Sequence, residues 1–258
     1  MKIILAGLLA SFLTFPCIAF SQDATTFIPR TYWGISLTPH VLAKTKFTGN
    51  TAKYQVSSSP QLGGEVLIDY HYNFAKDLSL IFSVGGVAVG YNFKFYIDKD
   101  YFSPPTEVDI YDSHNTARDI NFNLKGQVEL QKYFRKGQNK SWIIAAGGSV
   151  LYSPLNHEEY SYSVYFSNSE IYNYLNRDQV PNNDGKPWLN VHLSAGRQWE
   201  FRKRDALQCK LKANYSPVKF LKGTYAFDVG AEPRESGNYS VSGSYIGLSF
   251  SYVRSGRR

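Results

Sequence analysis

Histidine, serine and acidic side chains are the residues that could carry chemistry in this sequence, and their spacing is the first evidence about function. The five histidines are dispersed, and none occurs in a metal-ligand spacing such as HxH or HExxH. His40 precedes a serine run at residues 57–59, but the spacing gives no support for a nucleophilic site built from them. The sequence therefore predicts no catalytic residues.

Two acidic stretches are candidates for binding a divalent cation: His157-Glu158-Glu159 and residues 109–112. Carboxylates in polar loops are ordinarily solvated, and neither stretch has the ligand pattern of a calcium loop. The run Asn-Asn-Asp-Gly at 182–185 has the chemistry of a turn, which explains it without a metal. We therefore expect no metal site and no cofactor.

The composition favours a β-rich fold. Aromatic residues make up 16% of the chain, with 20 Tyr and 17 Phe, and these residue types suit strands. The formal net charge of +7 is spread along the chain. Together with a secretory N-terminus, this distribution argues against a nucleic-acid partner.

The N-terminus is typical of a secretory signal peptide. Lys2 is followed by an apolar run over residues 3–15, and Ala19 and Ser21 supply the small residues of a cleavage site. We expect cleavage near Ser21, which divides the chain into a signal peptide at 1–21 and a single further domain at 22–258. Cys209 is then the single cysteine of the second part, so no internal disulfide can form.

Beyond residue 21 the recurring pattern is a side-chain period of two, which predicts β-strands. In NFNLKGQVEL (121–130), Phe122, Leu124 and Val128 lie on one face, and Lys125 and Glu129 lie on the other. No later apolar run is long enough for a transmembrane helix. The segments assigned as strands are 31–42, 61–74, 78–96, 119–134, 141–153, 187–201, 206–216 and 240–253.

The connections between these segments alternate in length. Short polar turns occupy 75–77, 135–140 and 202–205, whereas the other four connections are long and rich in Tyr, Asn, Ser, Asp and Pro. A compact soluble domain seldom has four such loops. An up-and-down barrel in the outer membrane has this rhythm, with turns at one end and loops at the other. The long connections are 43–60, 97–118, 154–186 and 217–239.

Two all-β folds fit these strands, and they differ in which face meets the core. A soluble barrel or sandwich turns its apolar face inward, whereas an outer-membrane barrel turns it toward lipid. Aromatic residues gather near one end of the predicted strands, where they would form a girdle at the membrane interface. This placement favours the membrane barrel. The predicted girdle consists of Trp33, Phe74, Phe134, Trp142, Trp199 and Tyr252.

The polar faces of the same strands carry charges of both signs. Inside a narrow barrel, such charges must be paired or hydrated, and we expect them to form a structural network in the lumen. Lys125 and Glu129 would pair with charges of neighbouring strands such as Glu65 and Asp69. The predicted network consists of Glu65, Asp69, Lys125, Glu129, Lys210 and Lys212.

These features, with the final strand SYIGLSFSYVR (244–254), resemble the small outer-membrane β-barrels of the OmpA/OmpX type. The resemblance covers most of 28–254 and rests on architecture rather than on a specific motif. It implies an all-β, eight-stranded antiparallel up-and-down transmembrane barrel with short periplasmic turns and long extracellular loops, in the outer membrane of a Gram-negative-type cell. The chain departs from the group at its end, because Ser255-Gly256-Arg257-Arg258 replaces the usual terminal aromatic residue.

An eight-stranded barrel encloses an interior just wide enough for side chains, so we expect no large pore. The expected partners are membrane lipid, lipopolysaccharide and a protein or surface ligand at the outer loops. Tyrosines among Ser and Asn in 154–186 would suit such binding, although extension of the fifth strand explains them equally well. The alternatives are an accessory subunit of a secretion or motility complex and an enzyme at the barrel rim that acts on lipid or peptide. The candidate loop residues are Tyr160, Tyr162, Tyr165, Tyr172 and Tyr174.

Overall fold

Strands dominate the computed structural model of the chain, and eight of them close into a barrel. Among the described residues, no helix is long and apolar enough to cross a membrane. The expected signal peptide at 1–21 lies outside the described residues. Those residues are 30–49, 54–91, 94–97, 110–112, 119–135, 139–153, 158–165, 171–181, 186–202, 205–227 and 235–255.

The barrel is antiparallel, and its hydrogen-bonded order is β1-β16-β13-β12-β9-β8-β5-β4. Closure occurs between the first and last strands, where Ile35 is opposite Tyr252. Each barrel strand corresponds to one predicted segment, which confirms the predicted fold. The barrel strands are β1 (Arg30–Leu42), β4 (Leu62–Ala75), β5 (Leu78–Tyr91), β8 (Asp119–Arg135), β9 (Lys140–Tyr152), β12 (Trp188–Arg202), β13 (Asp205–Tyr215) and β16 (Tyr245–Ser255).

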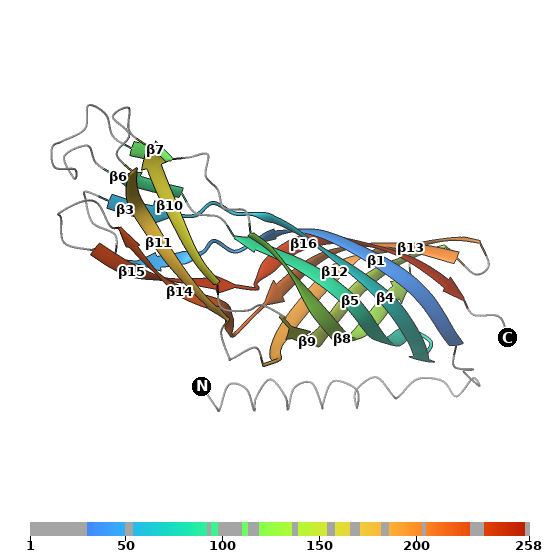
Figure 1. Ribbon diagram of the computed structural model, residues 1–258. Coiled ribbons are helices and arrows are strands. Elements are labelled where there is room, and N and C mark those ends of the chain that lie inside the picture. The colour runs from blue at the N-terminus through green and yellow to red at the C-terminus, as the bar shows by residue number, and fades with distance from the viewer. Residues whose placement is uncertain are drawn as a thin grey trace.

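The four long connections contain further strands, whereas the sequence analysis treats them as loops. Five of these strands form one sheet in the order β10-β11-β14-β15-β2, and three form another in the order β3-β6-β7. Figure 1 shows them beyond one end of the barrel, and we call them the outer extension. They are β2 (Lys46–Thr48), β3 (Tyr54–Ser57), β6 (Lys94–Ile97), β7 (Ile110–Asp112), β10 (Glu158–Tyr165), β11 (Ile171–Pro181), β14 (Lys219–Phe227) and β15 (Glu235–Ser242).

The outer extension repeats the strand order of the barrel. The sheet β10-β11-β14-β15-β2 stands over the arc β9-β12-β13-β16-β1, because each of its strands directly follows or precedes the corresponding barrel strand in the chain. The sheet β3-β6-β7 stands over β4-β5-β8 in the same way. The extension is therefore a continuation of the barrel wall in two arcs. Within the described residues, no ladder joins β7 to β10 or β2 to β3.

The barrel is inside out relative to a soluble protein. Leu124 is 63% exposed on the outer wall, whereas the adjacent Lys125 is 2% exposed in the lumen. The same alternation recurs around the barrel, so that large apolar side chains cover the outside and polar ones fill the inside. The apolar surface needs lipid around it, and the closed ladder leaves no strand edge inside the bilayer. This is the architecture of an outer-membrane barrel.

The outer extension has the opposite polarity. In β15, Tyr239 and Val241 are buried in the interior, while Asn238 faces solvent. In the next strand, β16, the inward positions are Tyr245, Gly247, Ser249 and Ser251, and the outward side chains are apolar. An apolar interior with a polar outside is the arrangement that water requires. The reversal between Ser242 and Tyr245 therefore places the boundary between lipid and water at this level of the wall.

Candidate functional site

Glu65 of β4 is the centre of one cluster of charges in the barrel lumen. Its Oε1 accepts a hydrogen bond from Nζ of Lys212 over 2.7 Å, and its Oε2 pairs with Nζ of Lys125. Tyr245 donates its hydroxyl hydrogen to the same Oε2 over 2.7 Å. Three strands other than β4 thus supply a partner to one buried carboxylate, and the partners satisfy both of its oxygens.

Glu129 of β8 is the centre of a second cluster. Its Oε1 accepts a hydrogen bond from Nζ of Lys210 over 2.7 Å, and its Oε2 lies 3.0 Å from Nε2 of His192. Lys210 also donates to Oε1 of Gln131 over 3.1 Å. A neighbouring glutamine, Gln127, accepts a hydrogen bond from Lys212 over 2.9 Å and so lies between the two clusters.

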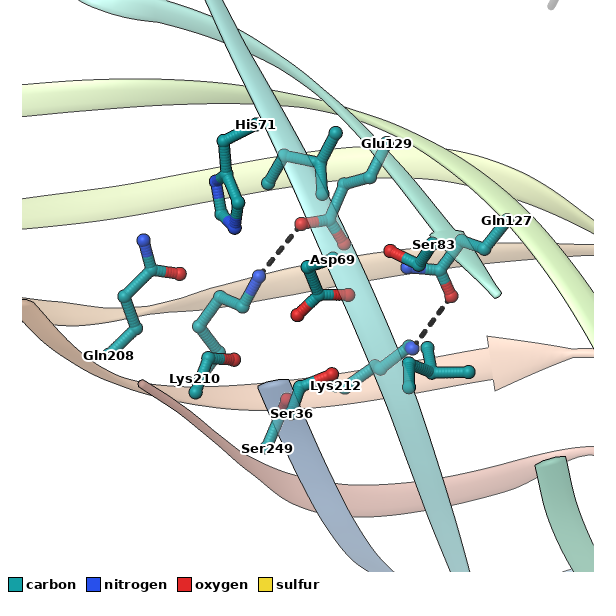
Figure 2. A pocket seen from close by; sticks show the side chains of 13 residues that line it. Ser36, Asp69, His71, Ser83, Gln127, Glu129, Gln208, Lys210, Lys212 and Ser249 are labelled. Carbon is teal, nitrogen blue, oxygen red and sulfur yellow. Dashed lines mark hydrogen bonds and ion pairs between the residues drawn. The ribbon is translucent and has the colours of Figure 1, made fainter. Parts of the chain in front are cut away.

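The six charges predicted for the lumen consist of three acids and three lysines, and all are buried. In the structure Lys125 pairs with Glu65, and Glu129 pairs with Lys210. Asp69 lines a small cavity with Lys210 and Glu129, which Figure 2 shows from close by. The cavity has a volume of only about 10 Å³, the space of about one water molecule.

Tyr245 is a lumen residue that the predicted network does not include. Its ring stacks on the ring of His40 with centroids 4.0 Å apart, and its hydroxyl joins the Glu65 cluster. The signal was present in the sequence, because Tyr245 shares the parity of Gly247, Ser249 and Ser251, which are lumen residues.

His40, the histidine considered for a rim enzyme, is buried at the top of the lumen. Its ring lies between Tyr245 and Gly63, where a side chain larger than glycine would collide with the imidazole. Its Nδ1 lies 3.1 Å from the carbonyl oxygen of Thr38. The hydroxyl of Ser58 instead contacts the backbone of Thr45 and Ser59. The histidine therefore has a packing role in this arrangement.

The predicted aromatic girdle lies at the end of the barrel opposite the extension. Trp33, Trp142, Phe134 and Tyr252 are exposed on the outer wall, and Phe74 and Trp199 are half-buried. Cations accompany these rings: the guanidinium of Arg197 lies 4.6 Å from the ring centroid of Trp142. Lys132 lies 5.7 Å from the ring of Phe134. Aromatic rings with adjacent cations are suited to the level of the lipid head groups.

The five candidate tyrosines lie on the hairpin of β10 and β11 in the outer extension. Along the backbone, Tyr160 is opposite Arg177 and Tyr162 is opposite Leu175. The register shifts between Tyr162 and Ser163, so the hairpin contains an irregularity close to Tyr174. β9 ends at Tyr152 and β10 begins at Glu158, so β10 stands over the fifth barrel strand in the continued wall. The remaining candidates are Tyr165 in β10 and Tyr172 in β11.

The described part of the chain contains no group of three or more His, Cys, Asp and Glu side chains that could hold a metal ion. The acidic stretches at 109–112 and 157–159 fall partly outside the described residues.

No protein-family model matches the sequence, and no curated protein matches it. Similar solved structures include the outer membrane protein OprG from Pseudomonas aeruginosa, at 8% identity over 87% of this chain and 95% of that one, with a TM-score of 0.41. The outer membrane protein AlkL is 13% identical over 92% and 96% of the two chains, with a TM-score of 0.36. The attachment invasion locus protein Ail of Yersinia pestis is 12% identical over 87% and 99%, with a TM-score of 0.34. At these values the similarity carries no information about function.

Proposed function

We propose that this protein is a non-enzymatic outer-membrane barrel that presents its extracellular extension to a protein partner. In this proposal the barrel anchors and orients the extension, and the hairpin of β10 and β11 is the binding element. The partner supplies an extended segment that pairs with β10. Recognition then needs no turnover, no cofactor and no traffic through the lumen.

The position of β10 as an edge strand among the described residues is the observation that carries the proposal. β10 is the end strand of its five-stranded sheet and pairs with β11 along Glu158–Tyr165. Within the described residues, the wall position on its other side belongs to β7, and no ladder joins the two strands. An edge strand offers a row of backbone donors and acceptors that an extended peptide can use. The run of eight residues is long enough for such pairing.

The filled lumen supports a role without transport. Lys125, Lys212 and Tyr245 converge on Glu65 in the interior, and the described cavity next to them is smaller than a solute. The packing of His40 supports a role without catalysis, because its ring lies against Tyr245 and Gly63 and is buried.

Photo-crosslinking in native membranes tests the proposal directly. A photoreactive amino acid at Ser161 should give one discrete adduct, because Ser161 lies in the middle of β10, the strand proposed to pair with the partner. The same amino acid at Leu124, on the lipid-facing wall, is the control and should give no protein adduct.

Proline substitutions at two successive positions of β10 distinguish the loss of pairing with a partner from the loss of the hairpin itself. Adjacent N–H groups of a strand point to opposite edges, so Ser161→Pro and Tyr162→Pro remove one outward donor and one donor of the β11 ladder. We expect one variant to keep the hairpin and lose the adduct. A discrete adduct with a stoichiometric membrane protein would identify the chain as an accessory subunit. The absence of any β10 adduct, with no phenotype after deletion of 158–181, would contradict the proposal.

A further inference from the structure

An apolar groove lies on the outer wall where the barrel meets the extension. It has a volume of about 990 Å³ and crosses β1, β16, β13, β12 and β9, which are neighbours in the barrel order. Its walls include the outward side chains Val41, Leu193, Tyr215 and Ile246, all of them exposed on the surface that faces lipid. These exposed side chains place most of the groove on the outer wall, although Tyr245 and His192, which belong to the lumen clusters, are also among its lining residues.

Small outward residues are part of the lining of the groove. Ala43, Gly148 and Ala213 face outward among larger side chains and leave room between them. The register connects these positions across the strands, since Gly148 is opposite Val191 and Ala213 is opposite Ile246. Each of these two small outward residues thus lies beside a large one of the neighbouring strand.

The upper end of the groove coincides with the polarity reversal of the wall. Ser244 lies in the segment between the polar-sided β15 and the apolar-sided β16, and it lines the groove. Lys44, which follows the end of β1, also lines the groove at this end and is exposed. Lys46, two residues later, is exposed as well. One end of the groove is therefore apolar and in the membrane, and the other is cationic and at the water boundary.

We infer that this groove is a binding site for a phosphate-bearing, anionic lipid of the surrounding leaflet. Its acyl chain lies along Val41, Leu193 and Ile246, and its phosphate is within reach of Lys44. The membrane level of the groove selects a lipid over a free anion, because most of the lining is apolar and below the boundary. The cation selects an anionic head group over a neutral one.

Native mass spectrometry of the detergent-purified protein measures this site with defined lipids. The probes are a phosphatidylglycerol and a phosphatidylcholine with the same acyl chains. We expect one phosphatidylglycerol to be retained more strongly than phosphatidylcholine. Ala213→Phe fills the groove and should weaken retention of both lipids about tenfold, as expected for losing the burial of about two methylene groups. The matched control is Ala195→Phe, because Ala195 is an exposed outward alanine of the adjacent strand that does not line the groove.

Replacement of Lys44 distinguishes the contribution of the lipid head group to binding from that of the acyl chain. Lys44→Gln should lower the preference for phosphatidylglycerol about fivefold and leave retention of phosphatidylcholine unchanged. Lys140→Gln, at the opposite end of β9, removes an exposed lysine as a control. Equal behaviour of the two phenylalanine variants would overturn the groove as a site. Equal retention of both lipids by the unaltered protein would overturn the assignment of an anionic ligand.

Discussion

Tyr245 donates a hydrogen bond to Glu65 over 2.7 Å, although the two residues are 180 positions apart in the chain. The contact exists because β4 and β16 both pair with β1, so their inward side chains meet across the lumen. Lys125 from β8 and Lys212 from β13 complete the group around Glu65. Four strands of the barrel are therefore joined through one buried carboxylate.

Removal of the Glu65 charge should destabilise the barrel. Glu65→Gln leaves Lys125 and Lys212 buried without the carboxylate that neutralises them, and breaking a buried ion pair in this way costs about 3–5 kcal/mol. Urea unfolding in detergent micelles, followed by the mobility of unboiled protein on SDS gels, measures the loss. Glu200→Gln, at an exposed position near the short-turn end, should change stability by less than about 0.5 kcal/mol.

A triple substitution distinguishes charge balance from packing. Glu65→Leu with Lys125→Met and Lys212→Met removes the ions together and should recover much of the stability lost in Glu65→Gln, because apolar replacements of a buried ion group can be neutral. Equal instability of the single and triple variants would show that the ionic contacts are not the source of the effect.

Spin labels can show which face of a barrel strand meets lipid and which faces the lumen. Phe250 points outward and Ser251 points into the lumen, so labels at these adjacent positions of β16 should differ in access to lipid-soluble oxygen. The labels are attached through cysteines in a Cys209→Ser background, since Cys209 is a free thiol. We expect strong oxygen access at 250 and weak access at 251. Greater oxygen access at 251 would reverse the assignment of the faces.

The barrel was predictable from the sequence because its signal is long and regular. Lipid on one side of the wall and a filled lumen on the other impose a strict alternation of apolar and polar side chains. In β8, for example, Leu124 is exposed on the outer wall and Lys125 is buried in the lumen. The strand ends were less accurate. The strand predicted at 78–96 ends at Tyr91 in the structure. The strand predicted at 240–253 is divided in two at Gly243 and Ser244. At Gly243 and Ser244 the wall leaves the membrane, and apolar side chains no longer face outward beyond them.

The outer extension was not predicted, because the polarity of its strands is reversed relative to that of the barrel strands. Tyr225 of β14 is buried, donates its hydroxyl hydrogen to the carbonyl of Thr48, and lies beside Phe47 of β2. These contacts join segments that are far apart in the sequence, so no local pattern reveals them. Ion-pair partners in the lumen were equally hidden, since parity shows which side a lysine faces but not which carboxylate it meets.

The interior of the outer extension should unfold independently of the barrel. Tyr239 is 2% exposed and lies 6.3 Å from the ring of Phe47, so Tyr239→Ser should cost about 3 kcal/mol locally, as for loss of a buried aromatic side chain. We expect faster proteolysis within 217–242 and an unchanged gel shift of the barrel. Asn238→Ser, at the adjacent solvent-facing position, is the control and should resist proteolysis like the unaltered protein.

The polarity reversal predicts that an introduced lysine destabilises the protein in the lipid-facing part of the wall but not in the outer extension. Leu248→Lys places a charge in the lipid-facing surface of β16 and should cost about 2–4 kcal/mol. Asn238→Lys lies on the outward face of β15, beyond the boundary, and should be close to neutral because that side chain meets water. Refolding yield into lipid vesicles and urea unfolding measure both. Similar losses for the two variants would contradict the boundary between Ser242 and Tyr245.

Two glycines of the barrel wall should respond differently to alanine. At Gly196 in β12 a Cβ atom would overlap the carbonyl oxygen of Cys209 in β13, so Gly196→Ala must separate the strands and should cost about 1–3 kcal/mol. At Gly126 in β8 a Cβ atom meets nothing within 4 Å, and Gly126→Ala should be neutral or slightly stabilising because alanine restricts the unfolded chain. Urea midpoints of the two variants, measured at the same detergent concentration, test this contrast. A destabilised Gly126→Ala beside an unaffected Gly196→Ala would mean that the close approach of β12 and β13 at Gly196 does not limit the packing of the wall.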